Sequence, residues 1–502
     1  MKRIAKFLSF CLMALAFSAC KKDKGNYDYQ DINEWGISNI QDSYSGLQGS
    51  VLNITPTITY TKDMSNDPSK YTYKWTNIDY GDGPLKERVI AETKDLNWTI
   101  SNPSNNTTYK LLFEVTEKST GLTFRKSTTL TVTSNISDGW LVLNDINGDA
   151  RLDFFNYVNN DFAYYNDLLA SFSTLKLNGK PKMLYFYQRR DPFSLVTARS
   201  IFVGTDQATF IIDTQDNTFS SFSNITNSMS NYVPPPYYAE KVRTQGRNMA
   251  YMLDSQGNLF FEFAANRSVF GTRVNRTSDG ENITISPYFA VTYGLGATHV
   301  LMYDVVKKRF LENKLFSTAS AVPSTKSTLF TPGDMNMDLM FMDNTPAFGG
   351  QNFAILKNSA NKIYLARIVC TLSAFNPAAF DEVNAPEMLN ATQFAIDPVS
   401  GYIMYVVGSK VYRYNPSDKA NAMVLDLGAR KVSLIKYNRF VYSNDARHVE
   451  YSRKLIVCSY DEANPATSGT MDLYTVPNLN GEISLYRSFT GLGKIVDVSY
   501  RE

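Results

Sequence analysis

Four oxygen-bearing side chains within a short stretch form the best candidate for a metal site in the sequence. They are Asp145, Asn147, Asp149 and Asp153, and Gly148 lies among them. Oxygen ligands at alternating positions around a glycine suit a hard cation such as calcium. The bidentate glutamate that closes an EF-hand loop is missing, and Asn-Gly is also a strong signal for a tight hairpin turn. Two alternatives follow, a calcium site and a polar hairpin turn.

A proline-rich stretch is the best candidate for contact with a ligand or partner. Its tyrosines are Tyr232, Tyr237 and Tyr238, which flank three consecutive prolines at 234–236. Prolines stiffen the backbone, so such a loop can present tyrosine rings at a small ordering cost on binding. Tyrosine rings stack on sugar faces or fill interface pockets. The alternative is a rigid connection whose tyrosines pack inward.

Other signatures of catalysis are absent from the sequence. It has no Gly-x-Ser-x-Gly nucleophile elbow, no phosphate-binding loop and no Cys or His cluster with zinc spacing. The only histidines, His299 and His448, are isolated. Carboxylates adjacent in sequence, such as Asp381 and Glu382, give no evidence for the separation across a cleft that a glycosidase needs. We therefore expect no enzyme and no cofactor, with calcium the one metal to consider.

The N-terminus predicts export and lipidation. Three basic residues precede an apolar run at 7–17 that is too short to span a bilayer, and small residues lead to Cys20. This pattern predicts a signal peptide at 1–19. It resembles a bacterial lipobox, in which the cysteine becomes the lipidated first residue, although Phe17 stands where the pattern prefers leucine. Residues 20–30 would form a polar tether, so that acyl chains anchor the protein to a membrane.

Charge and cysteine usage limit the partners further. Loss of the three basic residues in the signal peptide would change the net charge of +2 to −1. That value argues against nucleic acid, which needs a strong basic excess or patch. Beyond Cys20 and the cleaved segment, Cys370 and Cys458 remain in strand-like runs, with 87 residues between them. Export permits a disulfide, but we favour two small buried side chains on different strands.

Residues 31–134 predict an antiparallel β-sandwich. Their strand-like runs alternate apolar and polar side chains between turn residues, as at 109–115. A length of about 100 residues fits one immunoglobulin-like unit. Tyr73, Trp75 and the Gly-Asp-Gly at 81–83 resemble the Tyr-x-Trp…Gly-Asp-Gly pattern of PKD domains, with a longer spacing than usual. The resemblance implies that Trp75 packs between the two sheets.

Residues 138–502 predict a seven-bladed β-propeller. About seven units recur, each with an apolar strand, a polar turn and a second apolar strand, at an average of about 52 residues. One such sheet cannot bury both faces alone, whereas radial stacking buries them and leaves only short edges. Further sandwiches in tandem would supply the strands but not this spacing. The run at 494–498 is a candidate to close the ring, and 161–169 is a candidate short helix.

The whole arrangement resembles the PKD-like lipoproteins of Bacteroidetes. The resemblance rests on Gly-Asn-Tyr-Asp-Tyr at 25–29, on the sandwich, and on Gly-Trp-Leu-Val-Leu at 139–143. Members of that family are commonly encoded beside SusC/SusD-type outer-membrane nutrient importers. The resemblance therefore implies an accessory role, with a SusC-like TonB-dependent barrel and a SusD-like lipoprotein as partners.

We expect a non-catalytic accessory lipoprotein at the outer membrane, facing the cell surface, that helps to bind or deliver oligosaccharide or oligopeptide cargo. The alternatives are a surface glycan-binding protein and a propeller-type glycan-active hydrolase. A central funnel lined by carboxylates and aromatic rings would favour the enzyme. A funnel filled by apolar or mixed side chains would favour the accessory protein, and a flat row of exposed aromatic rings would favour the glycan-binding protein.

Overall fold

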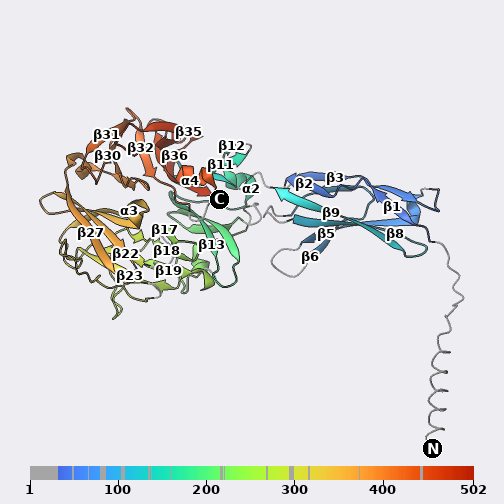
Figure 1. Ribbon diagram of the computed structural model, residues 1–502, viewed down its shortest axis with the longest axis horizontal. Helices are drawn as coiled ribbons and strands as arrows, with labels where there is room; N and C mark the ends of the chain where they lie inside the picture. The colour runs from blue at the N-terminus through green and yellow to red at the C-terminus, as the bar shows by residue number, and fades with distance from the viewer. Residues whose placement is uncertain are drawn as a thin grey trace, which may run out of the picture. The chain divides into compact units, whose positions relative to one another are not determined.

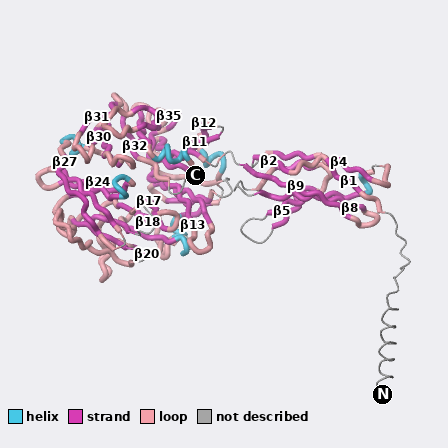
Figure 2. Tube along the Cα trace, viewed as in Figure 1, coloured by secondary structure: helices cyan, strands magenta, loops and turns pink. Residues whose placement is uncertain are grey.

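The computed structural model describes residues 32–502 except 48–49, 66, 80–85, 103–107, 134–135, 137, 159, 215–218, 220, 267–268, 293–298, 315–316, 372 and 441–444. The predicted signal peptide, most of the tether including Cys20, and the Gly-Asp-Gly at 81–83 therefore lie outside the described residues. The chain forms two compact units, the first holding most of residues 32–131 and the second most of residues 132–502. Both units consist mainly of strands (Figure 2), and the predicted all-β class is confirmed, with 55% strand and 7% helix.

The first unit is a β-sandwich of three sheets. Its strands are β1 (Trp35–Ser38), β2 (Ser43–Leu47), β3 (Val51–Ile54), β4 (Thr57–Tyr60), β5 (Tyr71–Asp79), β6 (Lys86–Ala91), β7 (Leu96–Thr99), β8 (Thr108–Glu117) and β9 (Thr123–Thr133), and a short 3-10 helix, η1 (Pro68–Lys70), precedes β5. The large sheet has the order β2-β9-β8-β5-β6, and the small sheets pair β1 with β4 and β3 with β7 (Figure 1). The long strands β5, β8 and β9 are antiparallel, as their alternating pattern predicts.

Trp75 lies in the interior of this sandwich. Its side chain is fully buried, and its ring packs on Phe113 of β8 with 4.6 Å between the ring centroids. The indole Nε1 donates a hydrogen bond to the carbonyl of Lys94 at 3.2 Å. Ile54 of β3 and Leu96 of β7 are buried as well. Because the ring is buried and its N–H has an acceptor, Trp75 stabilises the unit, as the PKD resemblance implies.

The described part of the second unit contains seven antiparallel sheets, which are the blades of a propeller. Blade 1 contains β10 (Gly139–Ile146), β11 (Asp149–Val158), β12 (Asp161–Tyr165) and β36 (Lys494–Arg501); blade 2 contains β13 (Pro181–Arg190), β14 (Thr197–Thr205), β15 (Thr209–Asp213) and β16 (Phe222–Asn224); blade 3 contains β17 (Ala239–Gln245), β18 (Met249–Asp254), β19 (Leu259–Phe263) and β20 (Thr272–Arg273); blade 4 contains β21 (Ala290–Val291), β22 (His299–Asp304) and β23 (Arg309–Lys314). Blade 5 contains β24 (Asp338–Thr345), β25 (Gln351–Lys357), β26 (Ile363–Cys370) and β27 (Phe375–Val383); blade 6 contains β28 (Gln393–Ile396), β29 (Ile403–Val407), β30 (Lys410–Tyr414) and β31 (Asn421–Asp426); blade 7 contains β32 (Lys431–Lys436), β33 (Lys454–Tyr460), β34 (Gly469–Thr475) and β35 (Ser484–Leu492).

The last strand of the chain closes the ring. β36 pairs antiparallel with β10, with Gly139 opposite Arg501, so it becomes the innermost strand of blade 1. The innermost strands contact one another in a cycle that runs β36, β13, β17, β21, β24, β28, β32 and back to β36. In Figure 1, β13, β17, β32 and β36 gather toward the middle of the unit. The closure predicted for 494–498 is therefore confirmed.

Each seam between neighbouring blades holds its own apolar cluster. Trp140 and Val142 of β10 point into the seam with blade 7, whereas Leu141 and Leu143 point into the seam with blade 2. This division follows because successive side chains of a strand face opposite sides. The remaining seams carry corresponding clusters. Burial on both faces explains why the blade strands have nearly continuous apolar runs, and it makes the seams the main source of the ring's stability.

The two cysteines occupy different seams and are unpaired, which confirms the favoured alternative. Cys370 belongs to the cluster between blades 4 and 5, and Cys458 to the cluster between blades 7 and 1. Burial raises the pKa of the Cys370 thiol to about 12. Both side chains therefore act as small apolar groups rather than as nucleophiles.

The prediction of a short helix at 161–169 is wrong for residues 161–165. Residues 161–165 form β12, which pairs with β11 and places Tyr165 opposite Phe154. The helix α2 (Leu168–Phe172) begins only after Asp167, whose Oδ1 accepts a hydrogen bond from the N–H of Ala170 at 3.1 Å. Pairing with a neighbouring strand overrides the local pattern here. The other short helices are η2 (Ile225–Ser228), η3 (Ala264–Asn266), α3 (Ala347–Gly350), η4 (Pro386–Asn390) and α4 (Ala446–Ser452).

Candidate functional site

A cavity of about 310 Å³ opens at the centre of the ring, and all seven innermost strands contribute to its lining. We call it the central cavity. Among the described residues, its lining holds five basic and four acidic side chains together with aromatic rings. This mixed and charged lining contrasts with the apolar seams that surround it. A concave site with convergent polar groups is the usual form of a ligand pocket, so the central cavity is the candidate functional site.

Two basic side chains of β17 face the central cavity next to each other. Lys241 and Arg243 are two residues apart, so they lie on the same face of the strand. The ammonium of Lys241 donates a hydrogen bond to the carbonyl of Pro287 at 3.1 Å and lies 5.0 Å from the centroid of the Tyr288 ring. The guanidinium of Arg243 donates to the carbonyl of Val242 at 3.3 Å. Within the described part of the chain, the ion pairs of the cavity are made by other residues.

Lys241 is electrostatically strained. Burial, followed by the positive charge of Arg243, lowers the pKa of Lys241 from 10.5 to about 7. The carboxylates of Asp343 and Asp497 oppose this shift, and the ammonium of Lys436 adds to it. Burial, more than any neighbouring charge, therefore sets the lowered pKa of Lys241.

Asp497 of β36 ties three innermost strands together. Its Oδ1 accepts a hydrogen bond from the Lys436 ammonium of β32 at 2.8 Å, and its Oδ2 accepts one from the N–H of Leu184 of β13 at 2.9 Å. Ser499, two residues further along β36, accepts a hydrogen bond from the N–H of Phe186 at 2.9 Å. These contacts join residues that are far apart in sequence, and they hold the wall of the cavity in place.

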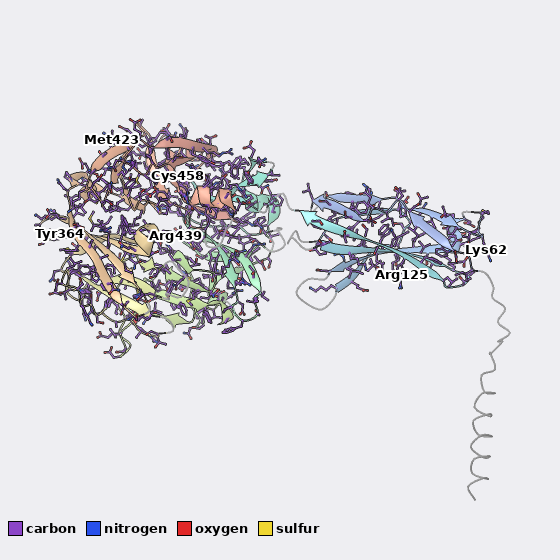
Figure 3. All side chains as sticks on the ribbon, viewed as in Figure 1. Lys62, Arg125, Tyr364, Met423, Arg439 and Cys458 are labelled. Atoms are coloured by element: carbon purple, nitrogen blue, oxygen red, sulfur yellow. The ribbon has the colours of Figure 1, made fainter. Side chains whose placement is uncertain are left out.

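Asp343 of β24 forms the second ion pair of the cavity, with Arg439 at 3.0 Å. Burial opposes the ionisation of Asp343, but the charges of Arg439, Arg243 and Lys241 together lower its pKa. Figure 3 shows Arg439 toward the middle of the unit, whereas Tyr364 lies at its rim. Asp343 is consequently an ionised partner for cations and not a proton donor near neutral pH.

The other two acidic side chains of the lining are Glu240 and Glu502. Lys182 of β13 pairs with Glu240 of β17 at 3.5 Å, and Glu502 follows the end of β36. Among the described residues, neither Lys241 nor Arg243 forms an ion pair within 4.0 Å, although the charge of Asp343 acts on both.

A separate charged group is buried in the seam between blades 2 and 3. Glu262 of β19 is 2% exposed, and its partner Arg189 of β13 lies 3.8 Å away. Burial raises the pKa of Glu262 to about 7, against the opposing effects of Arg189 and Tyr187. This carboxyl is a pH-sensitive point in an otherwise apolar seam.

The structure separates the three tyrosines that the sequence proposes as contact residues. Tyr237 is 1% exposed and belongs to the apolar cluster between blades 2 and 3, where its hydroxyl donates to Sδ of Met229 at 3.6 Å. Tyr238 is half-buried, with the Lys182 ammonium 5.3 Å from its ring centroid. Tyr232 is 86% exposed. None of the three lines the central cavity, and the inward packing of Tyr237 agrees with the alternative of a rigid connection.

The proposed calcium ligands lie on a hairpin. Asn147 and Gly148, with φ of 56° and 99°, form the tight turn between β10 and β11, and Oδ1 of Asp145 accepts a hydrogen bond from the N–H of Gly148 at 2.7 Å. Positive φ at both turn residues is the signature of the hairpin turn that Asn-Gly favours. In the register of the two strands, Asp149 lies opposite Ile146 and Asp145 opposite Ala150, so the two carboxylates point to different faces.

Asp153 is further from the turn and already occupied. It is fully buried, and it accepts hydrogen bonds from Arg151 at 2.7 Å, from Asn144 at 2.9 Å and from the N–H of Asp167 at 2.9 Å. Among the described residues, no group of three or more His, Cys, Asp or Glu side chains is placed to hold a metal ion. The geometry therefore favours the hairpin turn over the calcium site.

Reasoning from the sequence did not single out the charged lining of the central cavity. A partial signal was available, because Lys241 and Arg243 stand at alternate positions of one strand and therefore share a face. Which strand is innermost depends on the closure of the ring, however, and no local pattern reveals it.

Residues 20–181 match the PKD-like family. The match begins at Cys20, covers the sandwich and continues through β10, β11 and β12, which is less than half of the chain. No curated protein matches this chain. In the described residues, no helix is both long and apolar enough to cross a membrane.

Similar solved structures include two from Bacteroides thetaiotaomicron. One is a quinonprotein alcohol dehydrogenase-like protein, with 16% identity, a TM-score of 0.45, and coverage of 92% of this chain and 97% of that one. The other is the extracellular domain of a putative one-component system, with 9% identity, a TM-score of 0.37, and coverage of 91% and 69%. A periplasmic gluconolactonase from Pseudomonas aeruginosa has 11% identity, a TM-score of 0.28, and coverage of 73% and 99%. Since no TM-score here reaches 0.5, the fold assignment rests on the strand pairings of this chain.

Proposed function

We propose that this protein is a non-catalytic accessory lipoprotein of a SusC/SusD-like outer-membrane nutrient importer. It is anchored through Cys20 at the cell surface, and its propeller helps to bind or deliver oligosaccharide or oligopeptide cargo. The lipobox-like sequence before Cys20 and the match of residues 20–181 to the PKD-like family support the anchored accessory role.

The state of the carboxylates in the central cavity favours a binding site over a hydrolase. Asp343 and Asp497 are two of the four acidic side chains of its lining, and each is held in an ion pair, at 3.0 Å and 2.8 Å. A glycoside hydrolase needs one carboxyl group with a raised pKa to protonate the leaving group. The pKa of Asp343 is lowered instead. A lining in which these carboxylates are held by cations favours a site that holds a ligand without cleaving it.

The test is recovery of the native complex from the membrane. An affinity tag is placed after Lys24 in the tether, because Glu502 lines the central cavity and a tag there would disturb it. Purification in mild detergent should recover a large outer-membrane barrel together with a SusD-like protein. Recovery of the tagged protein alone would contradict the accessory role and leave a free-standing surface glycan-binding protein.

The lipid anchor has a matched pair of cysteine variants. Cys20→Ala should abolish incorporation of labelled fatty acid and release the protein from the membrane fraction. Cys11→Ala, within the predicted signal peptide, should leave both unchanged. Equal labelling of the two variants would refute the assignment of Cys20 as the lipidated residue.

A further inference from the structure

The unpaired cations on β17 need an explanation beyond the packing of the ring. Lys241 and Arg243 are half-buried neighbours on one strand face, about 7 Å apart along the strand. Like charges held this close in a poorly solvated site repel each other and destabilise the fold. The pair is therefore a cost to stability that a bound negative charge would remove.

The rest of the lining suggests what carries that charge. The cavity volume of about 310 Å³ is at the small end of ligand pockets, which suits one or two sugar rings rather than a folded partner. Phe341, Phe394 and Tyr437 also contribute to the lining. Phe341 and Phe394 stack on each other in the seam between blades 5 and 6, with 5.4 Å between their ring centroids, so they form an apolar wall beside the cations. Lys241 and Arg243 would bind an acidic group through charge-assisted hydrogen bonds.

We propose that the central cavity binds an acidic saccharide, with the carboxylate of the sugar lying between Lys241 and Arg243. That the ligand is a saccharide rests on the proposed function, in which the protein binds nutrient cargo. The anion-binding part stands on the cavity alone. Binding involves no covalent step, and the ligand replaces water and relieves the repulsion between the two cations.

Calorimetric titration of the full mature protein in mild detergent tests the proposal with three probes. D-Glucuronate carries a carboxylate where D-glucose carries a CH2OH group, and sodium sulfate supplies negative charge without a sugar ring. We expect glucuronate to bind at least about ten-fold more tightly than glucose, since a hydrogen bond to a charged group is worth about 1.5–3 kcal/mol. We expect sulfate to bind more weakly than glucuronate.

Substitutions in the cavity locate the site. Lys241→Met and Arg243→Met should each weaken glucuronate binding by about ten-fold or more. Lys362→Met is the matched control, because Lys362 forms an exposed ion pair with Glu382 and does not line the cavity. It should leave the affinity unchanged. Thermal unfolding of each variant shows whether the ring is intact, and Arg243→Lys, which keeps the charge, should retain most of the binding.

Dependence on pH gives an independent readout. The charged groups that act on Lys241 are Arg243, Asp343, Lys436 and Asp497, and the lining contains no histidine among the described residues. The affinity for glucuronate should fall about ten-fold or more between pH 6 and pH 8.5, because Lys241 loses its proton as the pH rises through about 7. Lys241→Arg should bind glucuronate with no such loss.

The outcomes separate this inference from the proposed function. Equal affinities for glucuronate and glucose, or unchanged binding in both methionine variants, would refute the anion site. Sulfate binding as tight as glucuronate would refute the saccharide and leave only a small-anion site. Glucuronate binding without recovery of a barrel would support the anion site and refute the accessory role. Recovery of a barrel without glucuronate binding would support the accessory role and refute the anion site.

Discussion

The interior of the sandwich and the centre of the propeller have opposite chemistry. Trp75 is fully buried against Phe113, and its one polar atom has an acceptor. Lys241 lies instead beside a second cation around an open cavity, and its pKa falls to about 7. The first interior is closed and satisfied, whereas the second is open and carries excess charge.

This contrast separates stability from binding. The sandwich needs its interior filled, since its two faces have no other source of apolar contact. The propeller obtains that contact in the seams, such as the cluster around Trp140 and Val498. Its centre is consequently free to carry groups that are poor for folding and useful for a ligand. Four substitutions test this division, from the largest expected effect to the smallest.

The largest loss of stability should follow from Trp75→Ala. Removing a fully buried tryptophan takes away its apolar contacts and leaves a cavity, so the sandwich should lose about 3–5 kcal/mol of unfolding free energy. Urea unfolding followed by far-ultraviolet circular dichroism measures the change. Val89→Ala, at a side chain 51% exposed on β6, is the control. A loss confined to the propeller transition would contradict the placement of Trp75.

The pH dependence of propeller stability should come in part from Glu262. Its pKa is 4.5 in the reference state and about 7 in the folded protein, so the folded state binds more protons between these values. Stability should therefore fall as pH rises from about 4.5 through 7, by about 3 kcal/mol in all. Glu262→Gln should flatten this slope, measured by urea unfolding at several pH values.

The matched control for that slope is Glu382→Gln, at an exposed side chain of β27. It should leave the pH dependence as it is in the parent protein. A slope that persists in Glu262→Gln would show that the seam between blades 2 and 3 is not the pH-sensitive element.

Breaking one ion pair of the central cavity should have an intermediate effect. Asp343→Asn leaves Arg439, Arg243 and Lys241 with less negative charge. We expect a loss of about 1–3 kcal/mol, below the ~3–5 kcal/mol of a fully buried pair, because the two paired side chains are 21% and 29% exposed. Thermal unfolding measures it, and Asp343→Asn combined with Arg439→Gln should recover part of the loss. No recovery would mean that the two side chains act independently.

The smallest effect should follow from an ion pair at the rim. Lys362 and Glu382 pair at 3.0 Å, but their side chains are 55% and 51% exposed. Water screens such a pair, so Lys362→Ala should leave the urea midpoint unchanged. A loss as large as that of Asp343→Asn would remove the distinction between the cavity and the surface.

Several features of the fold follow directly from local sequence patterns. The alternation in β8 and the apolar runs in the blades predict strands, and their spacing predicts the seven units. The same approach was wrong at 161–165, where the chain pairs with β11 as a strand instead of forming the expected helix. It also offered Tyr237 as a contact residue, with inward packing as the alternative, and the structure buries this side chain.

The amino-acid sequence by itself determined the all-β class and the recurring strand–turn–strand units, because each depends on the side-chain pattern within one stretch of chain. It offered the run at 494–498 only as a candidate for closing the ring, and it left the pairing of Cys370 and Cys458 open. Only the tertiary structure decided the central cavity, because Asp497 contacts Leu184, 313 residues earlier in the chain, and Lys436, 61 residues earlier. A strand's period-two pattern separates its two faces, but it does not tell which edge of a sheet will face the axis of a ring. That is set when the last strand pairs with the first blade.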